Sequence, residues 1–180
     1  MHIGCAAAAR KCSGLLDQCS PNVHAVCMSE LESHLTEIPS GQLLARGVCR
    51  CLEGFGFASL TELAPARGLR VDVMALGPKG EIWIIECKSG RSDYLSDHKW
   101  EGYLPWCDRF FWAVDTGFPK EILPANSGLL IADPYGAELI RMPQEIPLAA
   151  ARRKTLTRLF ARQAATRLSR LRDPEGARLL

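Results

Sequence analysis

The chain has 180 residues, a net charge of +2 and a mean hydropathy of −0.02, with 47% hydrophobic and 23% charged residues. This is the composition of a globular domain with a substantial core, and no apolar run approaches the roughly 18 residues of a membrane-spanning helix. We therefore expect one main domain and no membrane partner.

The N-terminus, MHIGCAAAAR, lacks the cationic start and the full-length apolar stretch of a secretory signal. We therefore interpret the eight cysteines as reduced thiols of a cytoplasmic protein rather than as four disulfides. Residues 1–39 are predicted to form an N-terminal extension, disordered at least to residue 27. Two alternatives are a start codon assigned too early, with Met28 as the start, and a zinc site whose spacing matches no common pairing. That zinc site would use Cys12, Cys19, His24 and Cys27.

The rest of the chain shows alternating helical and extended patterns. The predicted elements are a helix from Ser40 to about Gly54, strands at 57–63, 70–76 and 81–89, a helix over about 92–106, a strand at 109–115, a hairpin of 129–134 and 137–142, and a helix at 149–171. This order predicts an α/β or α+β fold over 40–172, of which we favour α/β, with a mixed central sheet flanked by helices, and a tail at 173–180. The strand at 81–89 is mostly apolar, so we expect it to be central and buried.

Two carboxylates interrupt these apolar strands. Asp72 lies between Val71 and Val73, and Glu86 follows two isoleucines. A hairpin of 70–76 and 81–89 places both on neighbouring strands, and Lys88 shares the face of Glu86 because side chains alternate along a strand. Carboxylates that close repel unless a cation lies between them, so the pattern predicts a Mg²⁺ site.

The predicted ligands are Asp72, Glu86 and the backbone carbonyl of Cys87, with Glu62 as a further candidate acid. The metal would polarise a phosphate oxygen and activate water, while Lys88 would orient that water or stabilise the developing charge. A structural ion pair between Glu86 and Lys88 is the alternative, because E-x-K is a short motif that occurs often by chance.

The order of these segments resembles the PD-(D/E)XK nuclease superfamily, and most closely its MmcB-like branch of bacterial DNA repair proteins. The segments that carry the resemblance are RGVCRCLEGFGFASLTEL, RVDVMALGPKGEIWIIECKS, SDHKWEGYLPWCDRFFWAV, GLLIADPYGAELIRM and ARRKTLTRLFARQAATRL. They cover roughly residues 40–170.

The resemblance implies a restriction-endonuclease-like core of order α-β-β-β-α-β, a Mg²⁺ or Mn²⁺ cofactor and cleavage of a DNA phosphodiester. Carried over, Asp72 and Glu86 would be metal ligands and Lys88 the catalytic lysine. The chain departs from the superfamily pattern in two places. Val71 stands where the motif has proline, and the further acid of the first helix has no sure counterpart, since Glu53 lies late on that helix.

The candidate DNA contacts lie on two helices. In the superfamily, the helix after the lysine strand borders the active site, which points to Lys99 and Tyr103; a surface helix with Trp100 packed on the sheet is the alternative. His98 is interpreted as a surface residue rather than a base. Residues 150–180 carry net +7, which leaves −5 for the remainder and suits a polyanion held beside an acidic site. The predicted phosphate contacts there are Arg152, Arg153, Lys154, Arg158 and Arg162.

Together these features predict a metal-dependent DNA nuclease acting in bacterial DNA repair, which recognises DNA shape more than sequence. A catalytically inactive nuclease-fold protein that binds DNA with a partner is the first alternative. An enzyme on RNA or on branched DNA and a structural protein with an acidic ion pair are two more. A homodimer and a repair-protein partner are further expectations.

Overall fold

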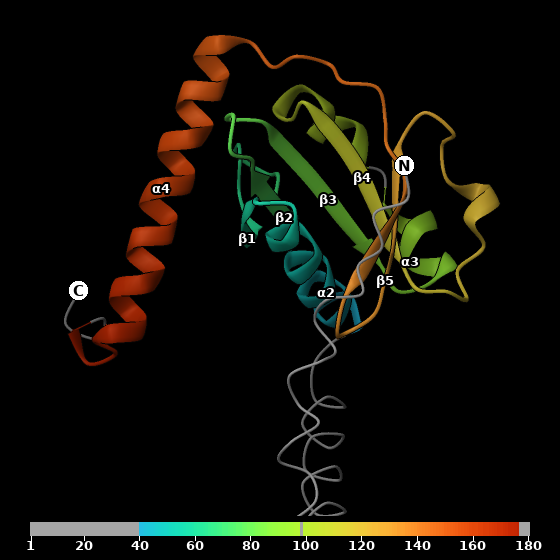
Figure 1. Cartoon of the computed structure of the whole chain (residues 1–180), viewed down its shortest axis with the longest axis horizontal. Coiled ribbons are helices and arrows are strands. Elements are labelled where there is room, and N and C mark those ends of the chain that lie inside the picture. Colours follow the sequence, from blue (N-terminus) through green and yellow to red (C-terminus); the bar gives the residue numbers. More distant parts are fainter. Residues whose placement is uncertain (1–39, 98, 177–180) are drawn as a thin grey trace, which may run out of the picture. The chain divides into compact units, whose positions relative to one another are not determined.

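The computed structural model describes residues 40–97 and 99–176, all within one compact unit, Pro39–Leu180 (Figure 1). The predicted extension at 1–39, with its alternative zinc ligands, lies outside the described residues, as do His98 and the last four residues of the predicted tail.

One mixed sheet of six strands forms the centre of this unit, in the order β1-β2-β3-β4-β5-β6. The strands are β1 (Ala58–Leu63), β2 (Val71–Leu76), β3 (Ile82–Lys88), β4 (Arg109–Val114), β5 (Gly128–Ala132) and β6 (Ala137–Arg141). The first three are antiparallel neighbours, β3, β4 and β5 run parallel, and β5 and β6 form an antiparallel hairpin. This confirms the predicted α/β class, the order of elements and the C-terminal hairpin.

Helix α2 (Ser40–Gly54) covers one face of the sheet (Figure 1). Its buried side chains include Val48 and Leu52, which belong to the same core cluster as Ile85 of β3. Gly47 lets the helix approach the β5–β6 hairpin, because a Cβ there would lie 1.9 Å from the carbonyl oxygen of Asp133. All seven residues of β3 are buried, as its apolar sequence predicts.

The other face is covered by α3 (Arg91–Ser96), the 3₁₀ helices η2 (Trp100–Trp106) and η3 (Lys120–Ile122), and part of α4. The single helix expected over about 92–106 is therefore wrong. Asp97 is extended and its carboxylate accepts the backbone N–H of Lys99 at 2.8 Å, which ends α3. Pro105 lies within η2, where it has no N–H to donate.

Helix α4 (Ala150–Arg172) is anchored at its first turn by an ion pair with the body of the domain. The carboxylate of Asp108, 2% exposed, accepts both terminal nitrogens of Arg153 at 2.6 and 2.7 Å. It also accepts the backbone N–H groups of Ile82 and Leu148. Burial alone would raise the pKa of Asp108, but these donors outweigh it and hold the pKa below its ordinary value.

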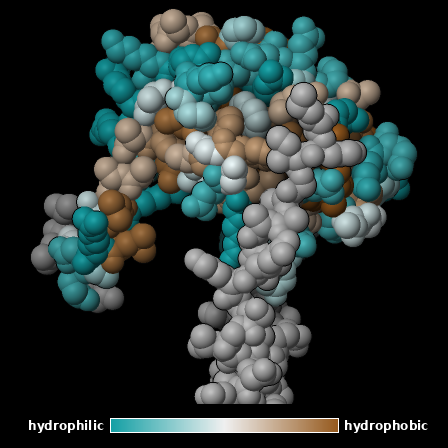
Figure 2. Space-filling view, in the orientation of Figure 1, coloured by the Kyte–Doolittle hydropathy of each residue, from teal (hydrophilic) through white to brown (hydrophobic). Residues whose placement is uncertain are grey.

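The apolar side chains of α4 are buried only in the first half of the helix. Leu156 and Phe160 are buried in the core, whereas Leu168 and Leu171 are 49% and 79% exposed. Figure 2 shows hydrophobic side chains together with hydrophilic ones at the far end of α4. None of the helices in the described ranges has the length and hydrophobicity to cross a bilayer.

Candidate active site

The candidate site lies where β2 and β3 separate. Their backbone pairing extends to Val73 and Ile85, and beyond that point the two carboxylates take over the hydrogen bonds between the strands. The N–H of Cys87 donates to Asp72 Oδ2 at 2.7 Å, and the N–H of Asp72 donates to Glu86 Oε1 at 3.2 Å. The sequence-based placement of both acids on adjacent strands is therefore confirmed.

The surroundings of both carboxyl groups disfavour their ionised forms. Glu86 is 3% exposed, and burial together with the charge of Asp72 raises its pKa to about 8. Burial also raises the pKa of Asp72, although the N–H of Cys87 and the charge of Lys88 oppose this effect. At neutral pH the pair therefore holds a proton in the absence of another cation.

Lys88 lies on the same face of β3 as Glu86, as predicted, but its ion-pair partner is Asp97. The ammonium Nζ is 2.6 Å from Asp97 Oδ2 and 4.0 Å from Asp93 Oδ1. The same ammonium lies 5.9 Å from the centre of the buried ring of Trp112. Burial would lower the pKa of Lys88, but these carboxylates outweigh it and raise the pKa, so the lysine stays charged.

Two open grooves meet at Asp72. The α2 groove, about 470 Å³, runs between α2, β1 and the acidic pair. Its lining residues are Gly41, Gln42, Ala45, Arg46, Thr61, Glu62, Asp72, Cys87, Lys88 and Asp93. The η2 groove, about 490 Å³, runs from Asp72 and Glu86 to the end of α3 and to η2. It is lined by Gly68, Arg70, Asp72, Glu86, Ser96, Asp97, Lys99 and Tyr103. A ligand in either groove therefore reaches the same carboxylate.

Glu62, the further candidate acid, lines the α2 groove but has its own partner. Its carboxylate is 2.7 Å from Arg70 Nε, and its backbone is in the left-handed region with φ of 54°. The guanidinium of Arg167 on α4 donates to the carbonyl oxygens of Thr61 and Glu62, which joins α4 to this edge of the sheet.

The predicted DNA contacts fall into two groups. Lys154, Arg158 and Arg162, here called the basic stripe, are exposed on α4, and Lys99 is exposed in the η2 groove.

The guanidinium groups of Arg152 and Arg153 are instead occupied by the protein itself. Arg153 is bonded to Asp108, while Arg152 donates to the carbonyl of Pro105 and lies over the ring of Trp106. The hydroxyl of Tyr103, which is 4% exposed, donates to the carbonyl oxygen of Arg70. These three side chains are therefore poorly placed to contact a phosphate directly.

Three residues that the sequence-based reasoning left out border the acids. Asp97 binds Lys88, while Gln42 and Arg46 line the α2 groove from successive turns of α2. Gln42 and Arg46 are exposed polar residues four apart on a helix whose opposite side is apolar, and that spacing is the signal that marks them. The sequence around Asp97 does not mark it in this way, because its contact with Lys88 forms only in the tertiary structure.

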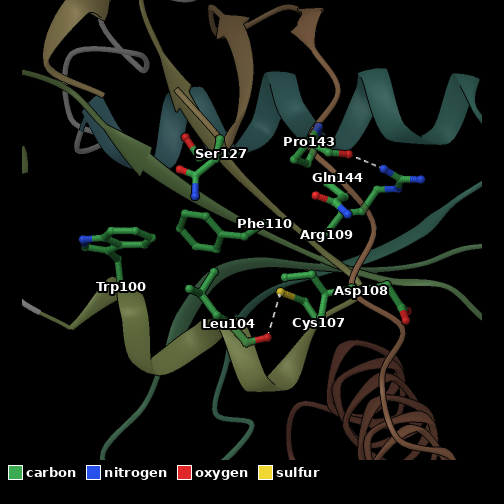
Figure 3. Close-up of a pocket in the computed structure, with 11 residues that line it drawn as sticks. Trp100, Leu104, Cys107, Asp108, Arg109, Phe110, Ser127, Pro143 and Gln144 are labelled. Atoms are coloured by element: carbon green, nitrogen blue, oxygen red, sulfur yellow. Dashed lines mark hydrogen bonds between the residues drawn. The ribbon is translucent and has the colours of Figure 1, made fainter. Parts of the chain in front are cut away.

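A separate cavity of about 80 Å³ lies between η2 and the segments that contain Ser127 and Pro143 (Figure 3). Trp100, Leu104, Cys107 and Phe110 form its apolar part, and Ser127, Pro143 and Gln144 border it from the opposite side. None of the residues that line it belongs to the acidic pair or to the basic stripe.

Comparison with known proteins finds a family and one close structural relative. The model of the family described as DNA repair protein MmcB-like matches residues 35–175. A solved structure of a protein of unknown function from Silicibacter pomeroyi is 65% identical, covers 77% of this chain and 95% of its own, and superposes with a TM-score of 0.76. No curated protein matches the chain.

Proposed function

The chain belongs to the MmcB-like family of DNA repair proteins, and on that premise we propose that it is a metal-dependent nuclease that hydrolyses DNA phosphodiester bonds. The observation that carries the proposal is the convergence of Asp72 and Glu86 at the point where β2 and β3 separate, with Lys88 beside them on the same strand. This combination matches the PD-(D/E)XK pattern that the sequence resembles.

The residues at this point fit a hard divalent cation such as Mg²⁺ or Mn²⁺. Mg²⁺ is commonly held by one or two carboxylates and otherwise by water and substrate phosphate, so two acids and a backbone carbonyl suffice. A cation would replace the proton that Glu86 keeps at neutral pH. Within 40–97 and 99–176 no three His, Cys, Asp or Glu side chains are grouped as metal ligands, so the proposed site depends on two carboxylates and one backbone carbonyl.

We assign the metal to Asp72, Glu86 and the carbonyl of Cys87. When bound, Mg²⁺ supplies a Lewis acid that polarises the scissile phosphate and activates water. Asp72 and Glu86 would hold the metal where the two grooves meet, and the phosphate would approach these acids only through that cation. Lys88, charged and buried, stabilises the negative charge that develops on the phosphate oxygens, and its effect is large because little water screens it.

The DNA backbone would be held by cations on both sides of the acids. Arg46 lies in the α2 groove and Lys99 in the η2 groove, and both side chains are exposed. The basic stripe on α4 extends this surface. We leave Arg152, Arg153 and Tyr103 out of it because their polar groups already have protein partners. A homodimer, a repair-protein partner and a cytoplasmic location remain part of the proposal.

A catalytically inactive DNA-binding protein is the second candidate, and two contacts favour it. Asp97 already neutralises Lys88, and Arg70 already neutralises Glu62. If Asp97 screens the charge of Lys88 from the phosphate when DNA binds, the protein has cations for binding but no lysine that acts in catalysis. The activity assay separates the two candidates.

The test is cleavage of supercoiled plasmid and of single-stranded, duplex, branched and RNA substrates with Mg²⁺, Mn²⁺ or EDTA. Wild type is compared with Glu86→Gln and Lys88→Gln. Glu121→Gln, an exposed acid on η3 away from both grooves, is the matched control. We expect metal-dependent cleavage that is lost in both site variants and kept in the control.

Two other outcomes of this assay would contradict or change the proposal. Wild type that binds DNA in a salt-sensitive manner but cleaves none of these substrates with either metal contradicts the nuclease and supports the inactive binder. Preference for RNA or for a branched substrate would retain the chemistry and change the substrate class.

A further inference from the structure

Lys88 is held in place by a residue from a different element. Its ammonium lies 2.6 Å from Asp97 Oδ2, and both side chains are nearly inaccessible, at 9% and 11% exposure. Asp97 is the residue at which α3 ends, nine positions after Lys88 in the chain. A flexible lysine stem in this contact loses most of the freedom it would have on a surface.

Asp97 is itself fixed from a second direction. Its Oδ1 accepts the N–H of Lys99 at 2.8 Å, while Oδ2 binds Lys88. Asp93, one turn earlier on α3, accepts the N–H of Ser89 at 3.2 Å. The two aspartates thus fasten α3 to the end of β3, directly after the candidate active-site strand.

We propose that Asp97 is a positioning residue that holds the charged ammonium of Lys88 against the substrate phosphate at the junction of the two grooves. This inference rests on the proposed nuclease function and adds to it a residue that binds neither metal nor DNA. Groups that orient a reactive side chain from behind commonly matter almost as much as the side chain itself.

The geometry leaves Lys88 able to act while it is held. An ammonium has three N–H donors, and Asp97 takes one of them. Asp93, at 4.0 Å, is beyond hydrogen-bond distance, and Lys88 still lines the α2 groove together with Asp72. Donors therefore remain for a phosphate oxygen. The opposite role, in which Asp97 masks the lysine, predicts the opposite kinetic effect on its removal.

The kinetic test compares wild type, Asp97→Asn, Lys88→Gln and the control Glu121→Gln on the DNA that wild type cleaves best. Asparagine keeps the size of aspartate and removes its charge. We expect Asp97→Asn to lower kcat by about 10- to 100-fold, by analogy with the loss seen when a residue that orients a metal-binding side chain is removed. KM should stay within about threefold, because both carboxylate oxygens of Asp97 are bonded within the protein, one to Lys88 and one to the N–H of Lys99.

A spectroscopic measurement tests the contact without turnover. In ¹⁵N-lysine-labelled wild type, the ammonium of Lys88 should give a slowly exchanging signal, identified by its loss in Lys88→Gln. The same signal should disappear in Asp97→Asn and persist in Glu121→Gln. If Asp97→Asn fails to fold, the wild-type spectrum decides, since no protected Lys88 signal would overturn the proposal.

The outcomes separate this inference from the proposed function. A folded Asp97→Asn variant with unchanged kcat, beside an inactive Lys88→Gln, overturns the positioning role and leaves the nuclease intact. A higher kcat in Asp97→Asn also overturns it and shows masking. Wild type without cleavage on any substrate overturns both. A lower kcat at constant KM, with loss of the Lys88 signal, supports the proposal.

Discussion

Replacing Glu86 by glutamine should stabilise the protein, and the gain should appear only at high pH. In the folded chain, burial and the charge of Asp72 raise the pKa of Glu86 from 4.5 to about 8. The unfolded chain therefore loses this proton near pH 4.5 and the folded chain near pH 8. Because the folded state binds more protons between these values, its stability falls as pH rises through that window.

The size of the effect follows from the same values. At about 1.4 kcal/mol per pKa unit, the burial of Glu86 destabilises the wild type by at most about 5 kcal/mol above pH 8. Solvent entry reduces this ceiling, so we expect Glu86→Gln to gain about 2–5 kcal/mol near pH 8.5 and less than about 1 kcal/mol near pH 5. Glutamine keeps an oxygen that can accept the N–H of Asp72.

Urea unfolding followed by tryptophan fluorescence, without metal and at both pH values, measures the difference. Asp97 and Asp108 have lowered pKa values, so the stability that they contribute is lost only below the ordinary aspartate range, and neither titrates between the two pH values. Because burial and the charge of Asp72 both raise the pKa of Glu86, the comparison reports on the acidic pair rather than on Glu86 alone. A Glu86→Gln variant that is less stable than wild type near pH 8.5, or that differs equally at both pH values, would refute the reasoning.

Four further predictions concern metal binding, the Asp108–Arg153 ion pair that holds α4, the close approach of Gly47 in α2 to the β5–β6 hairpin, and DNA binding by the basic stripe. Mg²⁺ should raise the melting temperature of wild type more near pH 8 than near pH 6, and should not stabilise Glu86→Gln, because binding needs the ionised carboxylates. Asp108→Ala should lower the free energy of unfolding in urea by about 3–5 kcal/mol, because Arg153 and two backbone N–H groups lose their acceptor. Glu145→Gln, at the more exposed ion pair with Arg109, should lower it by less than about 1 kcal/mol. Gly47→Ala should cost at least about 2 kcal/mol because its Cβ meets a carbonyl oxygen, whereas Gly54→Ala, with open space around it, should not destabilise; equal losses would count against the packing argument. Neutralising the basic stripe with glutamine should lower the salt slope of DNA binding by about 3, and an unchanged slope would remove α4 from the DNA surface.

The sequence carried enough local information to predict the sheet and the acidic pair. The uninterrupted apolar run of β3 identified a central buried strand, and the isolated acid within it identified an anomaly that needs a partner. The short turn at 77–80 then placed Asp72 opposite Glu86. Each of these inferences depends on contacts between residues close in the chain, whose geometry the periodicity of a strand fixes.

Other features depend on pairings that local patterns do not encode. The predicted helix over about 92–106 broke because Asp97 bonds to Lys88 and Lys99 instead of continuing the helix. From the sequence, Arg153 is predicted to contact DNA because it lies in a basic helix. In the structure it is bonded to Asp108, which is 45 residues away in the chain. The residue type alone does not show whether a charged side chain is exposed or is paired with a buried partner.

What the sequence by itself determined is which residues are apolar, which alternate, and where two acids and a lysine enter a buried strand. Only the tertiary structure decided which cations remain available beside those acids and which carboxylate holds Lys88. The physical reason is that hydrophobic periodicity is a local property of the chain, whereas ion pairing depends on distances of a few ångströms between elements that folding brings together.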